Sequence, residues 1–188
     1  MGVWKIAGET PADCGERDVI FALKSTSLVT EASRDDIPVL ADIHARCFQR
    51  GWSASEFQTL MADRLVQCLV LRRSTFRATD QVAGFVLARA VANEAEILTI
   101  GVHPDYRRSG CGRQLMEGLM RKLYGDRIAK LFLEVDASND PALSLYRDLG
   151  FEKVGERKGY YTKADDTPSL ALIMQVNLIG APVKRAKR

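Results

Sequence analysis

The spacing of hydrophobic residues along the chain predicts strands that alternate with helices. From residue 27 on, short and nearly continuous apolar runs alternate with longer segments whose apolar residues recur at about every third or fourth position. Runs of the first kind are typical of buried strands, and segments of the second kind are typical of helices with one buried face. The predicted strands span residues 28–30, 66–71, 82–91, 95–102, 129–135, 151–154 and 170–176.

Helices are predicted between several of these strands. The first follows residues 34–36 and has an apolar face at helical spacing, formed by Ile37, Leu40, Ile43, His44 and Cys47. Ser53 and Glu56 have the spacing of a capping box, which predicts that a second helix begins here and runs to about Met61. The order of strands and helices is that of a mixed α/β protein.

Glycine and proline mark the ends of two further helices. The third helix follows a loop that contains Gly110 and Gly112, and Gly125 stands where its C-terminal cap is predicted. Pro141 fits the first turn of the fourth helix, with Asp140 before it as the predicted N-cap.

The chain is predicted to form one soluble domain with an extension at each end. Residues 1–26 have no sustained hydrophobic period and are interpreted as an N-terminal extension, residues 27–178 as the domain, and residues 179–188 as a basic C-terminal tail. A content of 46% hydrophobic and 27% charged residues is typical of a globular protein, which excludes the disordered, collagen-like and disulfide-scaffold classes.

The net charge of +3 comes from the tail. Its basic residues are Lys184, Arg185, Lys187 and Arg188, and without them the chain has 23 basic and 24 acidic side chains. The domain is therefore close to neutral, which argues against a dedicated nucleic-acid-binding surface. We expect the tail to be a solvated, mobile end.

Cysteine and histidine usage predicts a reduced, metal-free, cytoplasmic protein. The four cysteines form no C-x-x-C pair, and the two histidines lack the spacing of metal ligands. No apolar run approaches the roughly 20 residues that a membrane-spanning helix needs, and no N-terminal run is long enough for a signal peptide. We therefore expect no membrane association.

A glycine-rich segment before the third helix has the features of a phosphate-binding loop. Its residues are Arg107, Arg108, Ser109, Gly110, Cys111, Gly112 and Arg113. Backbone N–H groups at a helix N-terminus are unpaired and lie at the positive end of the helix dipole, and arginines add charge-assisted hydrogen bonds. The segment has neither the Gly-Lys-Ser/Thr of a Walker A loop nor the third glycine of a dinucleotide-binding fingerprint. From these residues alone, a structural turn with solvated arginines is the alternative.

Read from Arg107, the pattern Arg-x-x-Gly-x-Gly resembles the acetyl-CoA loop of the GNAT acetyltransferases. Further stretches resemble the RimI-type branch of that family, the ribosomal-protein alanine N-acetyltransferases, in the right order: Trp52-Ser53, 95–102, 133–139, 145–151 and 159–161. The resemblance covers residues 27–178. It implies the GNAT fold, with a central mixed, mostly antiparallel sheet of about seven strands flanked by about four helices. Acetyl-CoA would bind where two parallel central strands splay.

The resemblance assigns three parts of the chain to the co-substrate acetyl-CoA. Residues 107–113 would hold the pyrophosphate, Ile100-Gly101-Val102 would pair through the backbone with the pantetheine arm, and Asn139 would contact acetyl-CoA. Backbone pairing requires no particular side chain, and asparagine is also a common turn residue. No metal ion is implied.

Glu134 and Tyr146 are the candidate catalytic residues. Glu134 is the only charged residue in the apolar run 131–135, and it matches the RimI-type glutamate that accepts the proton of the amine. Tyr146 matches the GNAT tyrosine that protonates the thiolate of coenzyme A, so the resemblance implies direct transfer. From the residues alone, a solvent-facing glutamate and a core tyrosine are the alternatives. A covalent mechanism through Cys111 is disfavoured, because direct transfer needs no nucleophile.

The resemblance implies that the acceptor is a protein N-terminus, the alanine of a small-subunit ribosomal protein. At pH 7 roughly a tenth of α-amines with a pKa of about 8 are neutral, against roughly 0.04% of lysine side chains, so this acceptor demands less of a base. Trp52, Tyr160 and Tyr161 would line the acceptor groove, with burial in the core as the alternative. Gly51 and Leu170 stand where RimI-type sequences usually have proline and an acidic residue.

Two other functions fit the same residues. One is a GNAT enzyme that acetylates lysine side chains or a small-molecule amine, and the other is an acetyl-CoA-binding regulatory module without catalysis. We expect no specific nucleic-acid partner, although the basic tail could make a weak, salt-sensitive contact with ribosomal RNA. No feature of the sequence indicates an oligomeric state.

Overall fold

The computed structural model describes residues 26–74, 80–162 and 168–179. The predicted N-terminal extension and basic tail lie outside the described residues, apart from Thr26 and Ile179. The strands are β1 (Thr26–Glu31), β2 (Val66–Ser74), β3 (Gln81–Val91), β4 (Glu94–Val102), β5 (Lys130–Asp136), β6 (Glu152–Thr162) and β7 (Pro168–Asn177). The helices are α1 (Ile37–Cys47), α2 (Ala54–Ala62), α3 (Cys111–Gly125) and α4 (Asp140–Asp148), with short 3₁₀ helices η1 (Arg34–Asp36) and η2 (Pro104–Tyr106).

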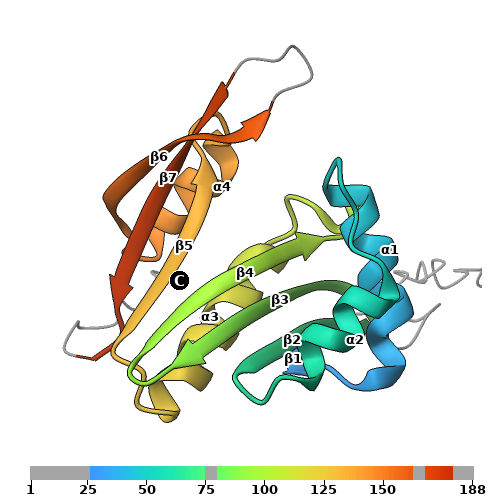
Figure 1. Ribbon diagram of the computed structural model, residues 1–188. Coiled ribbons are helices and arrows are strands. Elements are labelled where there is room, and N and C mark those ends of the chain that lie inside the picture. The colour runs from blue at the N-terminus through green and yellow to red at the C-terminus, as the bar shows by residue number, and fades with distance from the viewer. Residues whose placement is uncertain (1–25, 75–79, 163–167, 180–188) are drawn as a thin grey trace, which may run out of the picture.

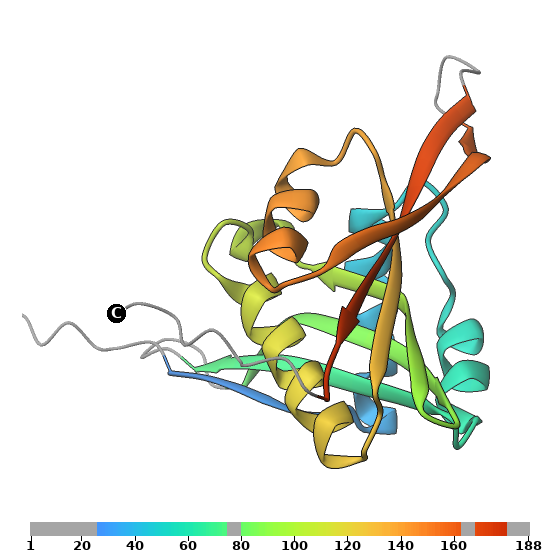
Figure 2. The same cartoon turned by 90° about the vertical axis from the view of Figure 1, so that its left-hand side faces the viewer.

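The strands form one mixed sheet in the order β1-β2-β3-β4-β5-β7-β6. Neighbouring strands run antiparallel except β4 and β5, which run parallel. Helices α1 and α2 lie on one face of the sheet, and α3 and α4 lie on the other (Figures 1 and 2). The predicted mixed, mostly antiparallel sheet with flanking helices is confirmed.

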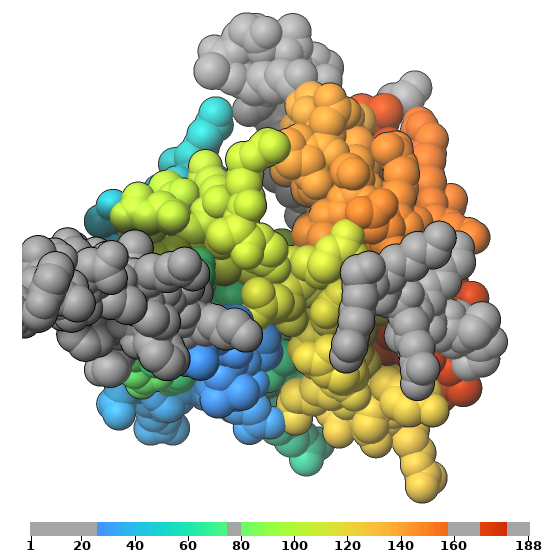
Figure 3. Space-filling view, turned by 180° about the vertical axis from the view of Figure 1, so that it is seen from behind, coloured from blue at the N-terminus to red at the C-terminus, as the bar shows by residue number. Residues whose placement is uncertain are grey.

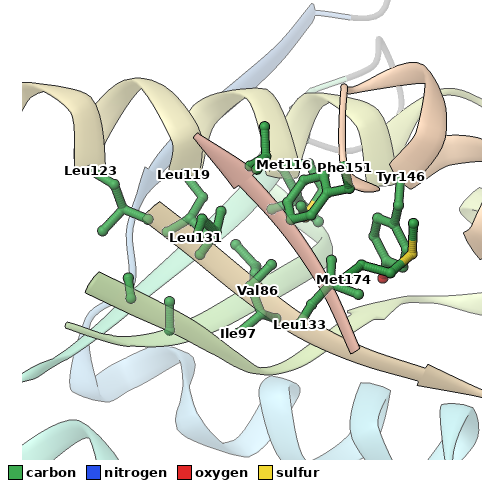
Figure 4. Packing of buried hydrophobic residues seen from close by; sticks show 14 of the residues in the cluster. Val86, Ile97, Met116, Leu119, Leu123, Leu131, Leu133, Tyr146, Phe151 and Met174 are labelled. Atoms are coloured by element: carbon green, nitrogen blue, oxygen red, sulfur yellow. The ribbon is translucent and has the colours of Figure 1, made fainter. Parts of the chain in front are cut away.

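A hydrophobic core fills each side of the sheet. On the α3–α4 face, the apolar stripe of α3 lies over alternate side chains of the strands, as Figure 4 shows. Its labelled members include Met116, Leu119, Leu123, Leu131, Leu133, Tyr146, Phe151 and Met174. On the α1–α2 face the core consists of Ile37, Leu40, Ile43, Phe57, Cys68, Val70, Phe85 and Leu87. The two cores hold β1–β4 between two helical layers.

Strands β4 and β5 pair only at their N-terminal ends. Their ladder consists of Glu94–Lys130, Ala95–Leu131 and Glu96–Phe132. Beyond it the two strands diverge into a V (Figure 1). The register of β4 against β3 shifts between Leu87 and Ala88, so that Leu98 has no residue opposite it in β3. A bulge of this kind bends and twists a strand, which helps β4 to turn away from β5.

The capping box of α2 is confirmed, whereas the predicted N-cap of α4 is wrong. The hydroxyl oxygen of Ser53 accepts from the Glu56 N–H at 3.3 Å, and the Glu56 carboxylate accepts from the Ser53 N–H at 2.7 Å. In α4 the N-cap is Asn139, whose Oδ1 accepts from the Ala142 N–H at 3.2 Å. Asp140 is instead the first residue of the helix, where a negative charge is favourable.

The predicted C-terminal cap at Gly125 is also wrong. Helix α3 includes Gly125, and the residue in the left-handed region that turns the chain is Arg127, with a φ of 62°. The following N–H, of Ile128, donates to the carbonyl of Leu123 at 2.9 Å and closes the helix end. The chain therefore turns away from the helix at Arg127, two residues after the predicted cap at Gly125.

Gly84 of β3 lies where no side chain fits, since a Cβ there would lie 2.7 Å from the carbonyl oxygen of Gly101 in β4. We expect Gly84→Ala to lower the free energy of unfolding by about 1–3 kcal/mol, because the two strands would have to move apart. In the control Gly125→Ala, the new methyl group meets nothing within 4 Å, and stability should stay the same or rise by up to about 1 kcal/mol. Urea unfolding followed by circular dichroism measures both. Equal effects of the two substitutions would contradict the close approach.

Candidate functional site

The two candidate catalytic residues lie on opposite faces of the sheet, beside the diverging end of β5. Leu133 and Val135 belong to the core on the α3–α4 face, so Glu134 between them faces the α1–α2 side. Tyr146 of α4 lies on the α3–α4 side, is only 6% exposed, and packs on Phe151 with ring centroids 5.8 Å apart. Figure 4 shows its ring beside Met174. The two side chains thus lie on opposite sides of the sheet.

Glu134 makes an ion pair that the sequence did not predict. Its side chain is 17% exposed, and its Oε1 lies 3.1 Å from Nη1 of Arg157 in β6. Strand β7 separates β5 from β6, so no local pattern in the sequence connects the two residues. The predicted strand 151–154 ended before Arg157, so the sequence carried no signal that could have identified this partner.

Residues Ile100–Val102 of β4 have a partner strand on one edge only. Phe85 of β3 lies opposite Gly101, whereas the ladder to β5 includes only the first three residues of β4. A Cβ on Gly101 would lie 2.9 Å from the Phe85 ring, so this close approach favours glycine. The carbonyl oxygen of Val102 accepts a hydrogen bond from the thiol of Cys47 at 3.3 Å. The edge that has no partner strand faces the divergence, where the predicted pantetheine contact would be made.

The first part of the glycine-rich segment forms a turn into α3, as predicted, whereas Cys111, Gly112 and Arg113, which were predicted to lie in the loop, are the first residues of the helix. Gly110 is the N-cap of α3 and has a φ of 80°, in the left-handed region that L side chains rarely adopt. Arg108 also lies in this region, with a φ of 59°. The Ser109 hydroxyl donates to the carbonyl of Tyr106 at 2.6 Å and holds the turn. The first N–H groups of α3, from Cys111 on, have no acceptor within the helix itself.

The arginines of this segment have different partners. Nη2 of Arg107 lies 3.6 Å from the thiol of Cys47 at the end of α1. Arg113 pairs with Asp148 of α4 at 2.8 Å, so its guanidinium also joins α3 to α4. Gly112 lies between the two helices, where a Cβ would lie 3.4 Å from Leu145. The predicted loop residues are thus brought together, with Arg113 already engaged by a carboxylate.

Arg73 is a further cation beside the loop, which the sequence analysis missed. It lies at the end of β2, with its guanidinium 5.3 Å from the centroid of the Tyr106 ring and its Nη1 3.4 Å from the Ser109 hydroxyl. A cation over an aromatic face is favourable and helps to fix the turn. The thiol of Cys111 lies 3.2 Å from the same hydroxyl and is 2% exposed, as expected for a residue that packs in the core.

Three further predicted site residues are Asn139, Tyr160 and Tyr161, and only the first has a described side chain. Asn139 uses its side-chain oxygen to cap α4, at the end of the loop that follows β5. Tyr160 and Tyr161 lie in β6, with Tyr161 opposite Ser169 of β7, and their side chains lie outside the described residues. The backbone therefore places both tyrosines in the hairpin that carries Arg157.

His44 of α1 organises the connection between α1 and α2, which the sequence analysis missed. Its buried ring stacks between Phe48 and Trp52, with centroids 4.3 and 4.7 Å away, and Phe57 lies edge-on to it. Its Nδ1 accepts a hydrogen bond from the backbone N–H of Trp52 at 3.0 Å. Trp52 is thus held by its ring and its backbone. It lines a surface pocket of about 420 Å³ with Ser55, Glu56, Thr59 and Leu60.

Burial shifts the pKa values of two side chains on the α1–α2 side. Desolvation lowers the pKa of His44, which the nearby carboxylate of Glu56 partly opposes. Cys68 belongs to the core on the α1–α2 face, and this burial raises the pKa of its thiol to about 12. In the described ranges no three His, Cys, Asp or Glu side chains are grouped as a metal site requires. Among the helices described, none is long and apolar enough to cross a bilayer.

The chain belongs to the acetyltransferase (GNAT) family, whose family model matches residues 37–151. The mixed sheet with diverging β4 and β5, and the glycine-rich turn into α3, fit this assignment. It is therefore an N-acetyltransferase.

Within this family the chain is similar to ribosomal-protein alanine N-acetyltransferases. It is 32% identical to the [ribosomal protein bS18]-alanine N-acetyltransferase of Escherichia coli (strain K12) over 137 residues, which are 73% of this chain and 88% of the relative. The crystal structure of the ribosomal-protein-S18-alanine N-acetyltransferase from Escherichia coli matches with a TM-score of 0.74 and 30% identity over 87% of this chain and all of that one. Arabidopsis thaliana NAA60 in complex with acetyl-CoA shares the fold, with a TM-score of 0.69 and 20% identity over 81% of this chain and 98% of that one.

Protonation of His44 should destabilise the fold. Because burial lowers its pKa in the folded state, the unfolded chain takes up a proton at a higher pH than the folded chain does. The contribution of neutral His44 is therefore complete above a pH of about 6.5, the ordinary histidine value, and is lost as the pH falls towards the lower folded value.

We expect His44→Phe, which keeps a ring but loses the acceptor for the Trp52 N–H, to be less stable than the parent by about 1–2 kcal/mol near neutral pH. This difference should shrink as the pH falls from about 7.5 to about 5.5, since only the parent has the histidine to protonate. Urea unfolding at several pH values measures it, and a difference that stays constant with pH would contradict the expectation.

Proposed function

We propose that this protein transfers the acetyl group of acetyl-CoA to the N-terminal amine of a protein. The observation that carries the proposal is the placement of Glu134 and Tyr146 on opposite faces of the sheet, beside the strand that diverges from β4. A base on one face and an acid on the other suit a reaction in which the acceptor and the acetyl donor approach from different sides.

Acetyl-CoA would bind on the α3–α4 side. The first N–H groups of α3 offer donors to the pyrophosphate, and Arg107 and Arg73 add positive charge beside them. The free backbone edge of Ile100–Val102 can pair with the amides of the pantetheine arm. Seen from behind, the surface is hollowed between the loop before α3 and helix α4, and this hollow would admit the arm (Figure 3). Arabidopsis thaliana NAA60, which shares this fold, was solved in complex with acetyl-CoA, and this supports acetyl-CoA as the co-substrate.

In the proposed reaction the neutral amine attacks the thioester carbonyl carbon, a C–N bond forms and the C–S bond breaks. Glu134 takes one proton from the nitrogen, directly or through water, and Tyr146 gives its phenolic proton to the departing thiolate. The proton on Glu134 then returns to the Tyr146 phenolate through solvent, so that no proton is gained or lost. The products are the acetylated N-terminus and free coenzyme A.

The names of the relatives support an acceptor class for this proposal. The Escherichia coli proteins that resemble this chain are named as alanine N-acetyltransferases of ribosomal protein bS18 or S18. We therefore propose an alanine-first ribosomal protein as the acceptor, bound on the α1–α2 side between Trp52 and the β6–β7 hairpin. The rival acceptors are lysine side chains and small-molecule amines.

An alanine-first peptide that matches the N-terminus of bS18 should be acetylated at its α-amine. The matched control is the same peptide with a blocked N-terminus and its lysines intact, and it should remain unmodified, because its lysines are almost entirely protonated. Incubation with acetyl-CoA followed by mass spectrometric mapping separates the cases. Acetylated side chains beside a bare N-terminus would overturn the proposed acceptor.

Glu134→Gln should lower turnover by about 10²–10⁴-fold, since it removes the general base. Tyr146→Phe should lower turnover for loss of the acid, and neither substitution should change the affinity for acetyl-CoA measured by calorimetry. The matched controls are Glu96→Gln, at the paired end of β4, and Tyr124→Phe, on the exposed side of α3. Binding of acetyl-CoA without any turnover would indicate the regulatory module. Turnover that does not depend on Glu134 or Tyr146 would contradict their assignment as base and acid.

A further inference from the structure

The ion pair between Arg157 and Glu134 links two strands that are not neighbours. Nη1 of Arg157 lies 3.1 Å from Oε1 of Glu134, and β7 lies between their strands. The side chain of Arg157 is 52% exposed, and ion pairs with an exposed partner typically contribute only about 0–1 kcal/mol to stability. Stability is therefore a weak explanation for a cation at this place, beside a candidate base.

The register of the sheet brings Arg157 to Glu134. Ala171 of β7 is paired with Asp136 of β5 on one side and with Arg157 of β6 on the other, so all three side chains share the α1–α2 face. Ala171 is fully buried, and its methyl group leaves room for the Arg157 side chain to cross β7 diagonally. A larger residue at this position would obstruct the crossing.

Other charged side chains near this ion pair have hydrogen-bond or ion-pair partners of their own. Oδ1 of Asp136 accepts from the backbone N–H and the hydroxyl of Ser138, each at 2.7 Å, in the turn that leads to α4. Lys153 pairs with Glu156, and these two residues lie opposite Met174 and Leu172, which belong to the core on the other face of the sheet. Among the side chains that the structure describes, the cation paired with Glu134 is Arg157.

We propose that Arg157 is a positioning residue for the base. Its guanidinium holds Oε1 and so fixes the orientation of the carboxylate, which leaves Oε2 to meet the acceptor amine. A guanidinium suits this role, because its planar, multiple N–H donors fix a carboxylate more closely than a single ammonium does. The inference rests on the proposed function of Glu134 as base.

The pair also connects the base to the hairpin that would bind the acceptor. Arg157 lies in the same strand as Tyr160 and Tyr161, the predicted acceptor-groove residues. A shift of β6 would therefore move the cation relative to Glu134. The base is correctly oriented only when this hairpin is in place, which ties turnover to the acceptor side of the site.

A double-mutant cycle tests the inference. Arg157→Gln should lower kcat for the alanine-first peptide by about 10–100-fold, in line with the cost of a misplaced catalytic group, with a smaller change in KM. In the Glu134→Gln background the same substitution should change the residual rate by less than about twofold, because its target is gone. Arg157→Lys keeps the positive charge but not the planar guanidinium with its several N–H donors. It should therefore show a smaller loss of kcat than Arg157→Gln.

The control is Lys153→Gln, which removes a cation and an ion pair from the opposite face of the same strand and should leave kcat within about twofold of the parent. Melting temperature and acetyl-CoA affinity should match the parent in all variants that involve Arg157. If Arg157→Gln unfolds the chain, the cycle is measured with Arg157→Lys instead.

The outcomes separate the two proposals. Full activity of Glu134→Gln would overturn the assignment of the base. A large loss in Glu134→Gln with parental activity in Arg157→Gln would overturn the positioning role alone. Equal losses from Arg157→Gln in both backgrounds would show that Arg157 acts independently of Glu134, and would also overturn it.

Discussion

The interrupted pairing of β4 and β5 is the constraint on which the rest of the structure depends. Two parallel strands in the middle of a sheet would normally satisfy each other's backbone groups along their full length. Here the ladder ends after three residue pairs, and the bulge at Leu98 turns β4 away. All seven strands therefore remain in one hydrogen-bonded sheet. At its centre, however, the C-terminal part of β4 has no partner strand on the side of β5. An extended ligand with amide groups can replace the missing strand.

The two faces of the sheet are stabilised by different kinds of contact. On the α3–α4 side a large core fixes α3, α4 and the buried ring of Tyr146, so the glycine-rich turn and the proposed acid are held rigidly. On the α1–α2 side the contacts that matter are polar and cross between elements. His44 holds the loop before α2 through the N–H of Trp52, and Arg157 reaches over β7 to Glu134. The proposed donor side is thus held mainly by packing, and the proposed acceptor side combines a smaller core with a few directed polar contacts.

Local patterns predicted most elements, and they failed where similar residues compete for one position. Asn139 and Asp140 are both good caps, and only the backbone geometry selects Asn139. Gly125 was expected to end α3, yet Arg127 adopts the left-handed conformation. The side-chain partner of Arg113 was missed for another reason, since Asp148 comes from the next helix along the chain and meets it only after both helices pack on the sheet.

The sequence by itself determined the order of strands and helices, the turn into α3, and the residue types at the site, because hydrophobic period, glycine placement and capping act over a few neighbouring residues. It also indicated Glu134, as a lone charge in an apolar strand. Only the tertiary structure decided that Glu134 and Tyr146 lie on opposite faces, and that Arg157 and Glu134 meet. Those relations depend on the insertion of β7 between β5 and β6 and on the register of three strands, which are properties of long-range pairing that no local pattern contains.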